Sequence, residues 1–256
     1  MSNMKSRMHS ETTGMIYGFL GVLGFSLTLP ASRFAVPVFG PTVVGPGRAL
    51  MAALIAGVVL WVRRERIPNV RQWRGLCHVA FGAVLAFPYL SAWAMDRLPA
   101  SHGAVELALL PLATAGASAL RNGEQPSLAF WAASFVGAGT VCAYAVLSGL
   151  GGVHLADLAL LAAVVIVAIA YAEGGRLAGQ LGGWQVIAWA LVLAAPVVIV
   201  LLLFGFPKSV VTAPASAWAA LLYLGVGSQF LAFVAWYTGL AMGGVARVSQ
   251  IQYLQP

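Results

Sequence analysis

The sequence predicts an all-α polytopic membrane protein, on the evidence of its composition and its apolar runs. Hydrophobic residues make up 61% of the 256 residues and charged residues only 8%, which leaves too little polar surface to cover a soluble domain of this length. Several apolar runs are long enough to cross about 30 Å of hydrocarbon as helices rising about 1.5 Å per residue. Stretches such as 158–170 are apolar on every side, whereas a membrane β-barrel needs alternating apolar and polar residues.

Eight apolar runs lie wholly within the chain, and each is expected to form one membrane helix. In order, they cover residues 14–38, 42–62, 74–95, 99–120, 127–148, 154–172, 184–206 and 215–241. The first follows a polar, weakly basic segment but is too long for the core of a signal peptide, so we expect it to be retained as a span. A ninth run begins at Gly244 and reaches the last residue.

The second half of the chain is a diverged copy of the first. The matching pairs are Gly82 with Gly225 and Trp93 with Trp236, each 143 residues apart, and Pro111 with Pro256, 145 residues apart. We therefore expect two repeats, at residues 1–148 and 149–256. The first copy continues beyond its match to Pro256, so the second repeat is expected to be C-terminally incomplete and the native bundle to have ten helices.

Five spans in each repeat are an odd number, which returns the second copy to the membrane from the opposite face. The repeats are therefore expected to be inverted, an arrangement common in transporters because two equivalent halves can alternate as outer and inner gates around a central site. With the N-terminus in the cytoplasm, ten of the 14 Lys and Arg residues would lie on the inner side. This agrees with the bias of positive charge toward cytoplasmic loops.

Short motifs along most of the chain resemble the drug/metabolite transporter superfamily, whose members are built from two EamA-type repeats. These motifs are Gly47-Arg48-Ala49, Leu110-Pro111, the segment Asn122–Pro126 and the segment Tyr253–Pro256. The sequence is most similar to the branch that exports aromatic amino acids across the bacterial inner membrane. The resemblance implies ten helices, cytoplasmic termini and a central cavity walled mainly by spans one, three, four, six, eight and nine.

Glu106 is the clearest candidate for a functional ionisable group inside the membrane, where such groups are costly unless paired or hydrated. It follows His102 by four residues in the fourth span, so both side chains share one helix face. Two interpretations remain open. Glu106 either binds a substrate ammonium group or a coupling proton, or it forms a structural pair with another helix.

The other ionisable groups are expected to have structural or interfacial places. Glu173 is close enough in sequence to Arg176 to be solvated beside it, and Asp157 falls at the end of a span. Glu11, Glu65, Asp96 and Glu124 lie in loops or at span ends. Arg48 lies inside the second span, and we expect a structural partner for it rather than a substrate.

Polar amides and aromatic rings supply the remaining candidates for a cavity wall. Amides donate and accept hydrogen bonds at once, which suits the ammonium and carboxylate of a zwitterion, although interhelical bonding is the alternative. Rings offer stacking surfaces for an apolar or aromatic substrate, with ordinary packing as the alternative. The predicted cavity residues, besides His102 and Glu106, are Tyr89, Trp93, Tyr171, Gln229, Trp236, Tyr237, Gln252 and Tyr253.

Prolines within the spans remove helix hydrogen bonds and permit kinks. We expect Pro88, Pro111 and Pro256 to act at gates or hinges. The four histidines are scattered without an HExxH motif, and no GxxxxGK[ST] loop is present, so neither a metal, a cofactor nor ATP hydrolysis is predicted. The charge of +7 is attributed to topology and anionic lipid and not to nucleic acid.

These observations predict a secondary transporter, not an enzyme, that exports amino acids, including aromatic ones, and related small metabolites by alternating access. It is expected to be a multi-pass protein of the bacterial inner membrane, with protons as a possible coupling ion. The alternative within transport is efflux of cationic drugs, with Glu106 as counter-charge. An intramembrane enzyme or a scaffold is the remaining alternative, although no catalytic constellation is evident.

Overall fold

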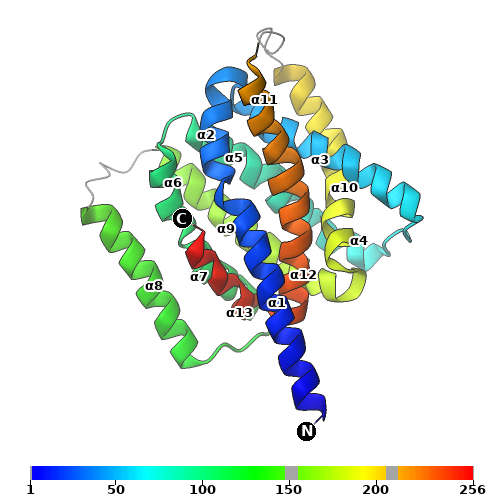
Figure 1. Cartoon of the computed structure of the whole chain (residues 1–256), viewed down its shortest axis with the longest axis vertical. Coiled ribbons are helices and arrows are strands. Elements are labelled where there is room, and N and C mark those ends of the chain that lie inside the picture. Colours follow the sequence, from blue (N-terminus) through cyan, green and yellow to red (C-terminus); the bar gives the residue numbers. More distant parts are fainter. Residues whose placement is uncertain (1, 148–154, 206–212, 256) are drawn as a thin grey trace.

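The computed structural model describes residues 2–147, 155–205 and 213–255, and every regular element in these ranges is a helix (Figure 1). The first repeat contains α1 (Ser2–Ser26), α2 (Thr28–Phe39), α3 (Pro41–Arg63), α4 (Val70–Val79), η1 (Ala80–Ala86), α5 (Phe87–Met95), α6 (Ala100–Leu107), α7 (Leu110–Asn122) and α8 (Leu128–Leu147). The second contains α9 (Leu155–Leu181), α10 (Gly183–Gly205), α11 (Ala215–Leu222), η3 (Tyr223–Ala232), α12 (Phe233–Gly243), α13 (Val245–Ser249) and η4 (Gln250–Leu254).

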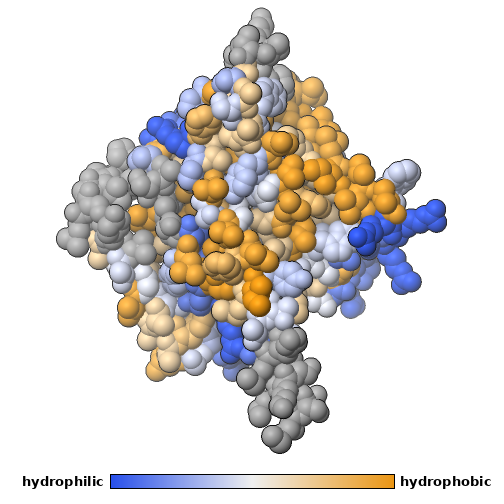
Figure 2. Space-filling model, viewed as in Figure 1, coloured by the Kyte–Doolittle hydropathy of each residue, from blue (hydrophilic) through white to orange (hydrophobic). Residues whose placement is uncertain are grey.

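Six continuous helical stretches in the described residues are long and apolar enough to cross a membrane. They are Ser10–Phe39, Pro41–Arg63, Val70–Met95, Leu155–Leu181, Gly183–Gly205 and Ala215–Gly243. Figure 2 shows apolar side chains over much of the surface and hydrophilic ones gathered where α3 passes to α4. Exposed side chains such as Phe204, at 89%, suit contact with lipid, since soluble proteins rarely expose contiguous apolar surface of this kind. The protein is a multi-pass membrane protein.

The fourth predicted span, 99–120, is not one continuous helix. It divides into α6 and α7, and α6 ends at Leu107, four residues before Pro111. The ring of a proline clashes with the carbonyl four residues earlier, which explains the break. The same spacing separates Pro30 from Ser26, where α1 ends, whereas α10 continues through Pro196.

Two π-helices occupy equivalent places in the two repeats. η1 begins at Ala80 and η3 begins at Tyr223, the same separation of 143 residues that relates the two copies in the sequence. Each contains one of the paired glycines, and a Cβ at either would crowd a neighbouring helix: Gly82 lies against Ala170, and Gly225 against Met51. π-Helical turns are rare and often occur at functional sites, so the two repeats share an uncommon backbone feature at matching positions.

Helix α1 packs along η3 and α12 from the other repeat, as Figure 1 shows. Glycines line their contact. A Cβ on Gly239 would lie 2.6 Å from the nitrogen of Gly18, and one on Gly14 would lie 2.5 Å from the nitrogen of Gly243, so neither position has room for a side chain. Small residues let membrane helices approach closely. This contact places the middle of α1 against the aromatic face of α12.

Candidate functional site

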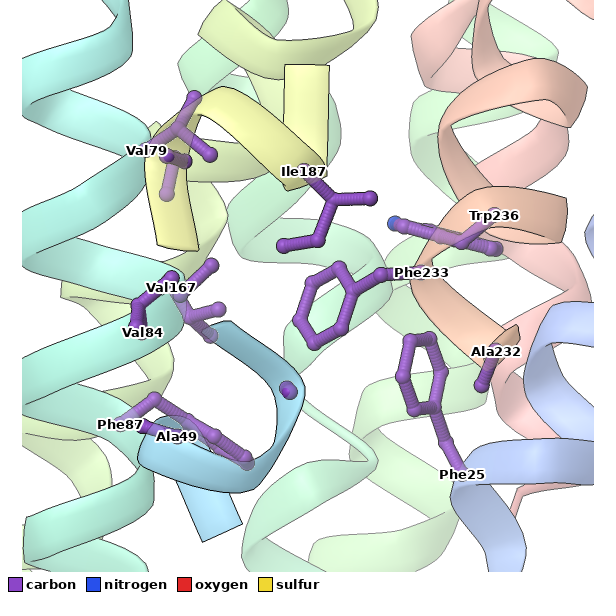
Figure 3. Close-up of a cluster of buried hydrophobic side chains, with 14 of the residues drawn as sticks. Phe25, Ala49, Val79, Val84, Phe87, Val167, Ile187, Ala232, Phe233 and Trp236 are labelled. Atoms are coloured by element: carbon purple, nitrogen blue, oxygen red, sulfur yellow. The ribbon is translucent and has the colours of Figure 1, made fainter. Parts of the chain in front are cut away.

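Five aromatic rings gather in the middle of the bundle, between α1, α9 and the junction of η3 with α12. Phe233, Trp236 and Tyr237 lie at i, i+3 and i+4 on one face of α12. Figure 3 shows Phe25 from α1 pointing toward Phe233 and Trp236. The ring centroids lie 4.9 Å apart for Phe25 and Phe233, 5.9 Å for Tyr171 and Phe233, and 5.4 Å for Tyr171 and Trp236. We call these five rings the aromatic cluster.

A buried polar network borders the aromatic cluster. Arg48 of α3, which is only 1% exposed, donates from Nη2 to the hydroxyl oxygen of Ser228 at 3.0 Å. The hydroxyls of Ser228 and Thr28 are hydrogen-bonded at 2.8 Å. Nε and Nη1 of Arg48 have no hydrogen-bond partner among the described residues. Arg48 thus has the structural partner that the sequence predicts, but this partner is a neutral hydroxyl.

A small cavity lies between the polar network and the aromatic cluster. Its walls include Phe25, Arg48, Tyr171, Ser228 and Phe233. Its volume of about 10 Å³ corresponds to roughly one water molecule. In this conformation the site is therefore closed around its own side chains, and a larger molecule requires the surrounding helices to separate.

Further buried polar atoms lack hydrogen-bond partners among the described residues. They include Nε1 of Trp236, the hydroxyl of Tyr237, Oε1 of Gln229 and both amide atoms of Gln252. The amide nitrogen of Gln229 donates to the carbonyl oxygen of Ala83 at 3.0 Å. Leaving a buried polar group unpaired costs about 1–3 kcal/mol, and two of these atoms, on Trp236 and Tyr237, belong to the aromatic cluster itself.

Glu106 and Asp157 form a second buried polar group, joining α6 to α9. The two residues are 7% and 6% exposed, and their carboxyl groups lie close enough to interact electrostatically. Two ionised carboxylates repel each other strongly in a buried site. Asp157 lies at the end of a span, in the first turn of α9, as the sequence predicts. It is buried, however, which differs from the interfacial place expected for it. The side chain of His102 lies outside the described residues.

The repeat-related tryptophans have different surroundings. Trp236 is fully buried in the aromatic cluster, whereas Trp93 is half-buried beneath the guanidinium of Arg97, 3.9 Å from its ring centroid. Tyr89, predicted with Trp93 as a cavity residue, is 37% exposed on α5. Neither Tyr89 nor Trp93 is among the residues that line the small cavity.

The remaining predicted residues lie around this centre. Tyr253 donates from its hydroxyl to the carbonyl of Ser134 at 2.9 Å, which ties η4 to α8. Pro88 is the second residue of α5, and Pro111 lies in the first turn of α7. Pro256 lies outside the described residues.

Several residues that the structure brings to this centre are not predicted from the sequence. Phe233 could have been predicted from its spacing in the sequence, because it shares a helix face with Trp236 and Tyr237. Thr28 and Ser228 could not, since hydroxyl residues are common in membrane helices and their pairing depends on the fold. Within the described residues no cluster of three or more metal-ligating side chains occurs.

A helical membrane fold with an enclosed centre between two repeats is the architecture typical of a transporter. The family model described as the EamA-like transporter family matches residues 12–145 and 154–256. The chain belongs to the EamA-like transporter family.

Individual relatives agree with this family. The chain is 43% identical over 249 residues to "Uncharacterized transporter YdeK" of Bacillus subtilis (strain 168), covering 97% of this chain and 87% of the relative. It is 24% identical over 237 residues to a "Probable terminal-alkyne amino-acid exporter" of Streptantibioticus cattleyicolor, covering 93% and 80%. A solved structure titled "Crystal structure of protein" superposes with a TM-score of 0.75 at 21% identity, covering 95% of this chain and 85% of that one, and shows the shared fold.

Proposed function

We propose that the protein is a secondary transporter that exports amino acids, including aromatic ones, across the bacterial inner membrane by alternating access. The observation that carries the proposal is the closed centre, where the aromatic cluster from α1, α9 and α12 adjoins buried polar atoms without partners. Rings enclose an apolar side chain, and unpaired donors and acceptors suit the charged groups of an amino acid.

The proposed mechanism uses the closed centre as an occluded state. The repeats at 1–148 and 149–256 rock against each other, so that the site opens to the cytoplasm, where the N-terminus lies, and then to the outside. The relative named as a probable amino-acid exporter supports this substrate class. The chain is proposed to carry out no chemical conversion.

The test is transport of labelled phenylalanine into liposomes that contain the purified protein, with and without an imposed pH gradient. Saturable uptake supports the proposal, and no uptake of any amino acid contradicts it. Loss of gradient-driven uptake in Glu106→Gln assigns proton coupling to the Glu106–Asp157 pair. Asp96→Asn is the matched control, since Asp96 is exposed and paired with Arg97 at 3.2 Å.

Efflux of cationic drugs is the second candidate, because a buried carboxyl pair can serve as a counter-charge for an organic cation. Uptake of a cationic drug into the same liposomes would favour this function, provided that phenylalanine inhibits the drug uptake only weakly. Chemical conversion of the solute would favour an enzyme instead.

A further inference from the structure

Arg48 is a buried cation without an anionic partner among the described residues. Its hydrogen bond goes to the hydroxyl of Ser228, and the titratable side chains that interact with its charge are the phenols of Tyr171 and Tyr223. A guanidinium stays protonated in proteins, and an uncompensated charge inside a membrane protein is costly. A residue kept only for packing would not need this charge.

Arg48 is one of the residues that line the small cavity. Nε and Nη1 have no partner among the described residues, while Nη2 is held by Ser228. Phe25, Tyr171 and Phe233 line the same cavity. The site thus combines hydrogen-bond donors of fixed positive charge with an apolar aromatic wall.

We propose that Arg48 binds the carboxylate of the transported substrate while the aromatic cluster encloses its side chain. A guanidinium recognises a planar carboxylate through charge-assisted hydrogen bonds that are about twice as strong as neutral ones. This inference rests on the proposed transport function and narrows its substrate class to organic carboxylates. An amine without a carboxylate lacks the group that Arg48 requires.

The same contact relates binding to the movement of the two repeats. Arg48 lies on α3 in the first repeat and Ser228 on η3 in the second. The cavity of about 10 Å³ shows that the site is closed. In this closed site the hydroxyl of Ser228 accepts a hydrogen bond from the guanidinium. In the open site, the carboxylate accepts hydrogen bonds from Nε and Nη1, the two nitrogens that have no partner among the described residues in the closed one.

Three aromatic probes that differ only in charged groups test the assignment: phenylalanine, phenylpropanoate without the ammonium group, and phenethylamine without the carboxylate. Their binding to purified wild-type protein is measured by calorimetry. We expect phenylalanine and phenylpropanoate to bind, and phenethylamine to bind at least tenfold more weakly. Equal or tighter binding of phenethylamine would overturn the proposal without using any variant.

Two variants test whether Arg48 is the residue that binds the carboxylate. Arg48→Met should weaken phenylpropanoate binding about 10- to 100-fold, as expected for a lost hydrogen bond to a charged group, whereas exposed Arg64→Met should leave it unchanged. Because Arg48→Met also removes an uncompensated buried charge, its melting temperature without ligand should not fall. A large fall in melting temperature, together with unchanged affinity of the folded fraction for phenylpropanoate, would show that Arg48 has a structural role instead.

The outcomes separate this inference from the proposed function. Amino-acid transport that is insensitive to Arg48→Met retains the function and refutes the carboxylate site. Absence of amino-acid transport by the wild type refutes the function, and the binding of phenylpropanoate relative to phenethylamine then decides the carboxylate site independently.

Discussion

The amide nitrogen of Gln229 donates a hydrogen bond to the carbonyl oxygen of Ala83 at 3.0 Å, which joins the π-helices of the two repeats. Both residues are fully buried. A π-helix shifts the regular pairing of backbone groups, and here an acceptor on η1 receives a side chain from η3. The contact lies where each repeat carries its matched glycine, so it links the two halves near their centre.

Gln229→Leu should lower both stability and transport. The substitution leaves the Ala83 carbonyl without this partner, and a lost hydrogen bond of this kind costs about 1 kcal/mol. We expect a lower melting temperature and a lower maximal rate of uptake in liposomes. Thr238→Val is the control, because the hydroxyl of Thr238 bonds within its own helix, to Val234 at 2.7 Å. Equal losses in the two variants would argue against a special role for the link between repeats.

Asp157→Asn should resemble Glu106→Gln in transport. The two buried carboxyl groups interact with each other, and two negative charges at one buried site repel, so we expect the pair to hold a single proton that either substitution removes. We expect both variants to lose the response of uptake to a pH gradient, and the double variant to behave like either single one. The measurement is initial uptake with and without the gradient. Additive effects in the double variant would show that the two carboxyl groups act separately.

The sequence predicts the membrane class and the internal repeat correctly because both are carried by long patterns. Apolar runs report burial in lipid directly, and the separation of 143 residues reappears as the spacing of η1 and η3. The break between α6 and α7 is harder to place, because Pro196 is accommodated within α10 while Pro111 is not. Local helix chemistry permits both results, and tertiary packing decides between them.

The candidate site was only partly predictable, because its polar contacts join residues far apart in the chain. Trp236 and Tyr237 lie in the aromatic cluster, but the repeat-related Trp93 lies under Arg97. Sequence symmetry therefore does not extend to side-chain surroundings. Arg48 illustrates the same limit, since its partner Ser228 lies 180 residues away. That two of its nitrogens lack partners among the described residues can be known only from the packed structure.

Glu124 is expected to stabilise the start of α13, although the sequence suggests no role for it. Its carboxylate accepts hydrogen bonds from the backbone nitrogens of Val245 at 3.0 Å and Ala246 at 2.8 Å, which have no acceptor within their own helix. Glu124→Ala should therefore cost about 1 kcal/mol. Thermal unfolding in detergent measures the effect, with Glu65→Ala as the control in another loop. An unchanged melting temperature would show that water replaces the carboxylate fully.

Gly239→Ala should separate α1 from α12 and disturb the closed site. The added Cβ would lie 2.6 Å from the nitrogen of Gly18 and 2.8 Å from the carbonyl oxygen of Gly14, so backbone must move. Overpacking of this kind costs about 1–3 kcal/mol. Gly139→Ala is the matched control, because a Cβ there meets no atom within 4 Å.

We expect Gly239→Ala to lower the melting temperature and to weaken phenylalanine binding, since α1 carries Phe25 and α12 carries Phe233 of the aromatic cluster. The control should match the wild type in both measurements. If Gly239→Ala changes stability but leaves affinity intact, the spacing of these two helices does not set the geometry of the site. Loss of both together would show that the glycine contact positions the rings that enclose the substrate.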